Sequence, residues 1–116
     1  MSETLSHAQF VAQVTYHSDG LVPAIAQHYQ TGEVLMLGYM NRDTLERTLQ
    51  TGYVTYWSRS RNKVWVKGEE SGHTQRVIEA HIDCDGDTLL FKVDQIGPAC
   101  HTGAPTCFFR QVAIES

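Results

Sequence analysis

We predict an α+β fold in which β-structure predominates, with a mixed sheet and one or two helices. Three observations lead to this prediction. Six or seven short runs are rich in β-branched and aromatic residues, glycine-containing turns separate them, and one segment has clear helix signals. Runs of strands without alternating helices favour a curved sheet over a βαβ arrangement. The length of 116 residues suits a single domain, which we assign to residues 1–116.

The first elements are a helix and a pair of strands. Residues 4–14 can form a short helix with apolar side chains partly on one side. Residues 21–29 and 30–40 are apolar enough to be two buried strands, and a tight turn at Thr31–Gly32 can join them. We therefore expect a hairpin in the core of the sheet.

The clearest helix covers residues 41–52. Asn41 can cap its start, Leu45 and Leu49 lie four residues apart on one face, and Gly52 can end it. Five strand-like runs follow, and they complete the predicted fold: residues 53–58, 63–68, 74–83, 88–96 and 106–114.

Composition excludes some classes of partner. The net charge of -4 and pI of about 5.8 lack the basic excess of a nucleic-acid binder. No apolar run approaches the roughly 20 residues that span a bilayer, and residues 1–10 do not resemble a signal peptide. We expect a cytoplasmic protein that binds neither nucleic acid nor membranes. In a reducing compartment its three cysteines are free thiols or metal ligands.

Carboxylates are concentrated at Asp83, Asp85 and Asp87. If the segment is extended, Asp83 and Asp85 point to one face and Cys84 to the other, and Asp87 can curl back beyond the glycine. Carboxylates suit Mg²⁺ and thiolates suit Zn²⁺, so this alternation predicts two separate metal sites. A calcium-binding helical loop is excluded because Thr88 replaces its required glycine. A solvated acidic turn remains the alternative.

Two further cysteines, Cys100 and Cys107, bracket a loop that contains Gly103 and Pro105. Such a loop can bring both sulfurs to one ion. Together with Cys84 they make three thiolates, and three ligands with one open position are typical of a catalytic zinc site. The alternative is that the cysteines are buried as small hydrophobic residues.

Cations and small polar residues are concentrated in residues 58–75 of this acidic chain. Guanidinium groups, an ammonium group, hydroxyls and accessible backbone donors can hold a phosphate. Nearby carboxylates and His73 can move protons. A solvated hairpin with ordinary surface charge is the alternative. The candidate substrate-binding residues are Arg59, Ser60, Arg61, Lys67, Glu69, Ser71 and Gly72.

These motifs together resemble the phosphoribosyl-AMP cyclohydrolase family of histidine biosynthesis. Two departures, Gly38 for the usual alanine and Thr106 for the common serine, affect no proposed ligand. The chain resembles the monofunctional form of the enzyme. The resemblance rests on six motifs that occur in the family's order: GLVPAIAQ from Gly20, TGEVLMLGYMN from Thr31, YWSRSR from Tyr56, WVKGEESGHTQ from Trp65, DCDGD from Asp83 and ACHTGAPTCF from Ala99.

The resemblance implies zinc on the three cysteines, magnesium on the three aspartates, and a homodimer that shares the zinc site between chains. It also implies a mixed sheet folded on itself as a pseudo-barrel. The family adds water to C6 of the adenine ring of phosphoribosyl-AMP and opens the N1–C6 bond. His101 is the first candidate for the general base and His73 the second. The alternatives are a non-catalytic zinc-stabilised nucleotide-binding module and a thiol redox protein, whose usual two-residue cysteine spacing is absent here.

Overall fold

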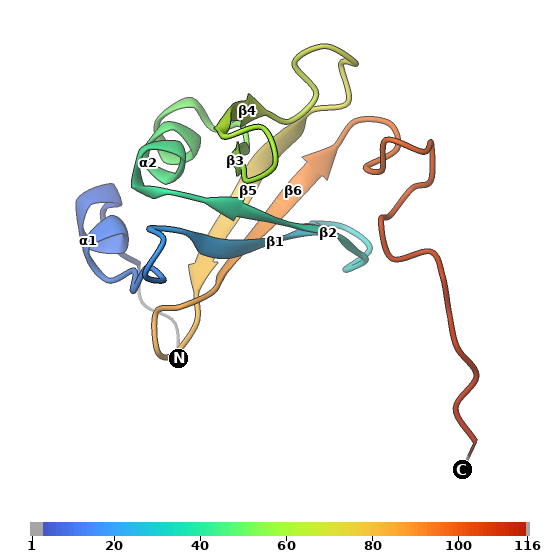
Figure 1. The fold of residues 1–116 in the computed structure, drawn as a ribbon, viewed down its shortest axis with the longest axis horizontal. Coiled ribbons are helices and arrows are strands. Elements are labelled where there is room, and N and C mark those ends of the chain that lie inside the picture. The colour runs from blue at the N-terminus through green and yellow to red at the C-terminus, as the bar shows by residue number, and fades with distance from the viewer. Residues whose placement is uncertain (1–3, 116) are drawn as a thin grey trace.

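The computed structural model describes residues 4–115 (Figure 1). Residues 1–3 and 116, the ends of the predicted domain 1–116, lie outside that range. Strand makes up 34% and helix 14%, so the predicted α+β class with predominant β-structure is confirmed. No helix in the described range is long and apolar enough to cross a membrane. The elements are α1 (His7–Ala12), β1 (Val22–His28), β2 (Val34–Met40), α2 (Arg42–Thr51), β3 (Thr55–Ser58), β4 (Lys63–Val66), β5 (Gln75–Ile82) and β6 (Leu89–Gln95).

Four strands form a mixed sheet in the order β2-β1-β6-β5. β1 is antiparallel to β2 and parallel to β6, and β5 is antiparallel to β6. The predicted mixed sheet is therefore confirmed, as is the hairpin of β1 and β2. The fold is not closed as a barrel, because β3 and β4 pair only with each other. Among the described residues, one isolated antiparallel bridge connects the two sheets. It joins Tyr53, which lies just before β3, to Arg76 of β5.

Local capping explains α2. The Asn41 side chain accepts a hydrogen bond from the Thr44 backbone N–H at 2.8 Å, and the Thr44 hydroxyl is bonded in return to the Asn41 N–H. Gly52 ends the helix with φ of 81°, in the left-handed region that favours glycine. Both predicted helix ends are confirmed. α1 is shorter than the predicted 4–14, since a capping box at Ser6 starts it.

The core lies between the four-stranded sheet, the two helices and the β3–β4 hairpin. Inward-facing β1 residues Val22, Ala24 and Ala26 are fully buried. Tyr56 of β3 is also buried, and its hydroxyl donates to Gln75 Oε1 at 2.8 Å. Its ring fits against Gly38 of β2, where a Cβ would lie 2.5 Å from Tyr56 Cδ1. The glycine that departs from the family pattern therefore makes room for a buried aromatic ring.

The predicted strand over residues 106–114 is wrong. Its start is anchored, since the Cys107 N–H donates to Leu35 O at 2.7 Å and the Thr106 hydroxyl to Val34 O at 2.7 Å. Beyond this point the chain runs away from the body as an arm (Figure 1). Residues 108–115 of this arm pair with no strand, so their β-like composition forms no sheet. Its large apolar side chains are 53% to 84% exposed: Phe108, Phe109, Val112 and Ile114.

Candidate functional site

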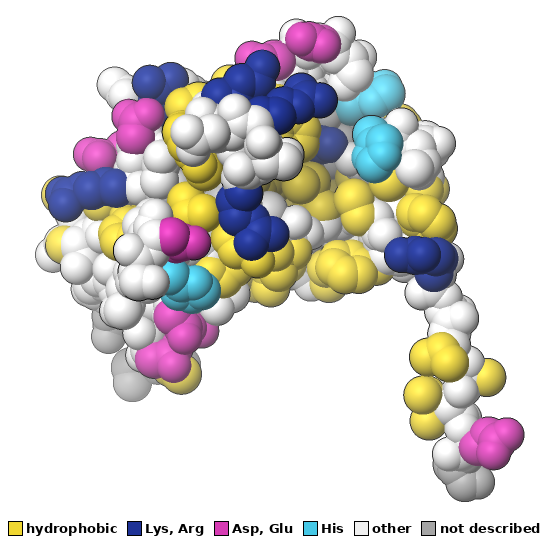
Figure 2. All heavy atoms as spheres, viewed as in Figure 1, with side chains coloured by type: hydrophobic (Ala, Val, Ile, Leu, Met, Phe, Trp, Pro, Cys, Tyr) yellow, Lys and Arg dark blue, Asp and Glu magenta, His cyan; other side chains and the backbone are white. Residues whose placement is uncertain are grey.

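A pocket of about 340 Å³ opens between β4, the loop after it and the loop after β6. It brings together two sequence segments, residues 61–73 and 98–103, that are far apart in the chain. Figure 2 shows Lys and Arg side chains over the β3–β4 hairpin, with histidine side chains beside them. The residues that line it are Arg61, Lys63, Trp65, Lys67, Gly68, Glu69, Glu70, Ser71, His73, Pro98, Ala99, Cys100, His101 and Gly103.

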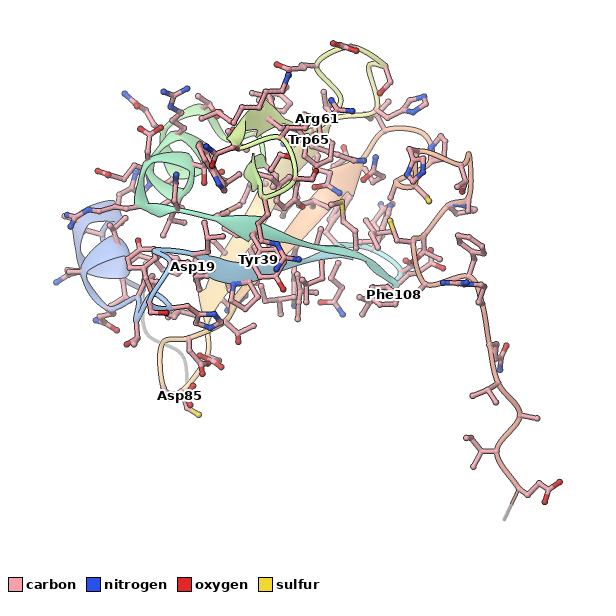
Figure 3. The ribbon with its side chains drawn as sticks, in the orientation of Figure 1. Asp19, Tyr39, Arg61, Trp65, Asp85 and Phe108 are labelled. Carbon is pink, nitrogen blue, oxygen red and sulfur yellow. The ribbon has the colours of Figure 1, made fainter. Side chains whose placement is uncertain are left out.

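β4 supplies one wall of the pocket. Side chains alternate between the two faces of a strand, so Lys63, Trp65 and, just beyond the strand, Lys67 lie on one side. Arg61 and Trp65 both line the pocket, and both belong to the β3–β4 hairpin region that Figure 3 labels. Lys63 and Trp65 were not among the predicted site residues. Their spacing of four and two residues from Lys67 was the signal that could have identified them, because it places all three side chains on one face of a strand.

His73 is fixed in the pocket by glycines on two sides. Its ring packs against Gly97, where a Cβ would lie 2.6 Å from His73 Cδ2, and its backbone carbonyl packs against Gly68. The same carbonyl accepts a hydrogen bond from Gln95 Nε2 at 3.2 Å. Gln95 is itself held by Gln75 at 2.9 Å. The second candidate base is thus connected to the buried core through two glutamine side chains.

The loop after β6 brings Cys100 and Cys107 together. Cys100 N–H donates to Ala104 O at 3.1 Å, which closes the loop between them. The Thr102 hydroxyl donates to Cys100 Sγ at 3.0 Å, and this hydrogen bond lowers the pKa of the Cys100 thiol. Desolvation, followed by the charge of Cys100, raises the pKa of the Cys107 thiol. Each thiol therefore alters the ionisation of the other, as two neighbouring ligands of one cation would.

Cys84 lies at the opposite end of the sheet. It precedes β6, whereas Cys100 follows it, and seven strand residues span about 23 Å at roughly 3.3 Å per residue. Figure 3 shows Asp85, next to Cys84, far from Phe108, next to Cys107. The three cysteines consequently do not meet within one chain.

The three aspartates lie together near Cys84. One carboxylate oxygen from each of Asp83, Asp85 and Asp87 lies within 4.8 Å of the others. The segment is a turn, because β5 ends at Ile82, so the condition that it is extended is not met. Asp83 Oδ1 closes this turn by accepting from the Asp87 N–H at 3.0 Å. Within residues 4–115 this is the only group of three or more carboxylate, thiol or imidazole ligands.

The charges of this acidic cluster are coupled. Hydrogen bonding to Asp85 and then to Asp83 raises the pKa of Asp87. Desolvation acts to raise the pKa of Asp83, but hydrogen bonds from Asp87 and the Thr88 backbone outweigh it, so the net shift is downward. A divalent cation would relieve this repulsion between carboxylates.

Three of the candidate substrate residues lie outside the lining of the pocket: Arg59, Ser60 and Gly72. The Arg59 guanidinium instead stacks over the Tyr39 ring, 3.8 Å from its centroid. Ser60 is near Ser58, with 3.4 Å between the two hydroxyl oxygens. The other four candidates, Arg61, Lys67, Glu69 and Ser71, line the pocket together with His73 and His101.

Comparison with known proteins identifies the family. The phosphoribosyl-AMP cyclohydrolase family model matches residues 36–109, which include the pocket, the thiol pair and the aspartates. The chain belongs to the phosphoribosyl-AMP cyclohydrolase family.

Curated cyclohydrolases confirm this membership along most of the chain. The phosphoribosyl-AMP cyclohydrolase of Micrococcus luteus is 65% identical over 84% of this chain and 78% of its own length. That of Streptomyces avermitilis is 59% identical over 93% and 81%, respectively. That of Acidiphilium cryptum is 57% identical over 90% of both chains. The chain is therefore a hydrolase of histidine biosynthesis.

The donor atoms of this cyclohydrolase fit the metals that the family implies. Cys100, which lines the pocket, and its neighbour Cys107 give two soft sulfur donors. The three aspartates give hard oxygen donors, suited to Mg²⁺, that lie within 4.8 Å of one another. The set of three thiolates that the family implies for zinc is incomplete within one chain, because Cys84 is at the other end of β6.

Proposed function

We propose that this cyclohydrolase hydrolyses phosphoribosyl-AMP in the cytoplasm, as a step of histidine biosynthesis. The reaction opens the N1–C6 bond of the adenine ring and gives phosphoribosylformimino-AICAR-phosphate. The observation that carries the proposal is the composition of the pocket. It combines an aromatic ring, exposed cations, two imidazoles and a thiol, contributed by Trp65, Arg61, Lys63, His73, His101 and Cys100.

Each part of the pocket suits one part of this substrate. The Trp65 ring offers a face on which an adenine base can stack. Arg61 and Lys63 can bind a phosphate, the first through its planar guanidinium and the second as a point charge. His101 and His73 stand on two different loops of the same pocket. An imidazole there can take a proton from water as the oxygen bonds to C6.

The proton balance of the reaction assigns a double role to that imidazole. Water forms a bond to C6, and the C6–N1 bond then breaks. The proton that the imidazole took from water passes to the departing N1 nitrogen. The remaining proton of the C6 hydroxyl is released to solvent as the carboxamide C=O forms from the cationic ring, so the histidine ends as it began. Zinc, when bound, supplies Lewis-acid chemistry that makes water easier to deprotonate. His101, adjacent to Cys100, is our first candidate for the proton carrier.

We further propose that zinc is bound by Cys84, Cys100 and Cys107, and magnesium by Asp83, Asp85 and Asp87. Two observations support a homodimer that shares the zinc site. First, β6 separates Cys84 from the other two thiols, so a second copy must supply it. Second, the arm begins immediately after Cys107 and leaves Phe108 and Phe109 exposed, where a second copy would cover them.

The test is absorbance-monitored opening of phosphoribosyl-AMP by the purified protein with Mg²⁺ present. Turnover is measured before chelation, after chelation and after zinc is restored, while circular dichroism follows the fold. We expect turnover to be lost and regained with the fold retained. A zinc- and magnesium-loaded protein that binds the nucleotide without opening it would instead be a binding module.

A further inference from the structure

Lys67 is the only charged residue that is buried in the described range, with 8% of its surface exposed. Its Nζ donates to the carbonyl oxygen of Ala99 at 2.5 Å and lies 5.3 Å from the centroid of the Trp65 ring. Its backbone N–H donates to Val54 O at 3.1 Å, so the Lys67 backbone is fixed to the residue that precedes β3. Lys67 is therefore held by hydrogen bonds at its backbone and at its ammonium group.

Burial of an ammonium group is unfavourable unless nearby groups offset the lost hydration. One carbonyl and one aromatic face are weak compensation for a full charge. Desolvation therefore lowers the pKa of Lys67, and the charges of Cys107 and then Cys100 oppose this shift without cancelling it.

The contact with Ala99 also has a mechanical consequence. Ala99 directly precedes Cys100 and is itself almost fully buried. The Ala99 N–H donates to Pro105 O at 3.2 Å, so both backbone polar groups of Ala99 are hydrogen-bonded. A hydrogen bond from Lys67 to this carbonyl thus sets the backbone from which Cys100 projects. β4 and the cysteine loop are joined at this point.

We infer that Lys67 is a positioning residue for the thiol pair and not a ligand of the substrate phosphate. It orients Cys100 through the Ala99 carbonyl and offsets the negative charge of the two sulfurs. Arg61 and Lys63, both exposed in the same pocket, are left to bind phosphate. This inference rests on the proposed zinc site of the cyclohydrolase.

The test compares Lys67→Met with Lys63→Met. Methionine keeps an unbranched stem against Trp65 and removes the ammonium group, and Lys63 is the matched exposed lysine two positions from Trp65. Zinc affinity is measured by competition with a chromophoric chelator. We expect Lys67→Met to weaken zinc binding by about 10- to 100-fold, the usual effect of losing a group that supports a ligand. Lys63→Met should keep the affinity of the parent protein.

Steady-state kinetics at saturating zinc give an independent readout. Lys67→Met should lower kcat and leave KM nearly unchanged, whereas Lys63→Met should chiefly raise KM. Lys67→Arg retains the charge and a donor, so it should bind zinc more tightly than Lys67→Met. Should Lys67→Met not fold by circular dichroism, Lys67→Gln against Lys63→Gln removes the same charge and makes the same comparison, with the zinc loss again confined to position 67.

Each contrary outcome is distinct. Unchanged zinc affinity with a raised KM in Lys67→Met would show that Lys67 binds the substrate phosphate. That result would overturn the inference, while the proposed function would stand. Equal loss of zinc affinity in the Lys63 variant would show a general charge effect and also overturn it. A parent protein that binds no zinc would contradict the proposed function itself.

Discussion

The imidazole ring of His73 packs directly against the backbone of Gly97. A Cβ at position 97 would lie 2.6 Å from His73 Cδ2 and 2.9 Å from Nε2, closer than atoms can approach. The hydrogen bond from Gln95 to the His73 carbonyl keeps the histidine backbone from moving away. Gly97 therefore determines where the ring stands in the pocket.

Gly97→Ala should displace this ring and lower kcat by about 10²-fold, because small misplacements of a catalytic group are costly. Steady-state kinetics and zinc content are the measurements, and zinc content should not change. Gly20→Ala is the control, since Gly20 has a similar φ of 79° against 68° but no atom within 4 Å of its Cβ position. Equal activity of the two variants would remove His73 from the mechanism.

His101→Ala should leave zinc content intact and reduce turnover by roughly 10²- to 10⁴-fold, the usual contribution of a general acid–base. The reason is that His101 lines the pocket beside Cys100 without being part of the proposed ligand set. Zinc is quantified by atomic absorption and turnover by the absorbance assay. His7→Ala, an exposed histidine on α1, is the control. Unchanged turnover in His101→Ala would leave His73 as the base.

Cys84→Ser and Cys107→Ser should each abolish turnover, and a mixture of the two should recover part of it. In a mixed dimer one shared site carries both substitutions and the other carries neither. Random pairing then restores about a quarter of the parent activity, from mixed dimers with one intact site each. The two purified variants are unfolded together, refolded and assayed. No recovery, despite the formation of mixed dimers, would argue against sharing.

Asp87→Asn should raise the melting temperature of the metal-free protein and remove the stabilisation that Mg²⁺ gives. The pKa of Asp87 is raised, chiefly by its hydrogen bonding to Asp85, so its ionised form is disfavoured in the folded protein. Folding without metal is therefore favoured as the pH falls through this pKa and opposed as it rises. Thermal melts at neutral pH with and without Mg²⁺ are the measurement. Asp19→Asn, outside the cluster, should keep the Mg²⁺ response.

Gly38→Ala should destabilise the protein by about 1–3 kcal/mol, the usual effect of overpacking a core. Alanine in place of a strand glycine would otherwise stabilise by roughly 0.5–1 kcal/mol. Here the new Cβ would lie 2.5 Å from the buried Tyr56 ring, which its bond to Gln75 restrains. Urea unfolding gives the free energy. In a double-mutant cycle, Tyr56→Val should cancel most of the loss, and independent effects would contradict the contact.

The interactions that local spacing encodes were predictable. Asn41 and Gly52 mark the ends of α2 because capping involves residues only a few positions apart. The hairpin of β1 and β2 follows from two apolar runs and a short turn. The aspartates meet for a similar reason, since a turn of a few residues brings their side chains together.

The pairing of distant segments could not be predicted in this way. The 106–114 run has strand composition, yet β-propensity acts only where another strand is available to pair. Lys67 was predicted to bind phosphate because it lies in a segment rich in cations. Its hydrogen bond to Ala99 instead connects residues that are 32 positions apart in the chain. No periodicity in either segment encodes that contact.

The sequence by itself determined the family, the β-rich class, the helix ends and the candidate ligands, because these depend on residue identity and short-range spacing. The tertiary structure alone decided which candidates share the pocket. It separated Cys84 from Cys100 by the length of β6, placed Arg59 on Tyr39, and brought Trp65 beside the histidines. The physical reason is that side-chain position in a folded chain depends on sheet order and on packing between distant segments, which local sequence does not specify.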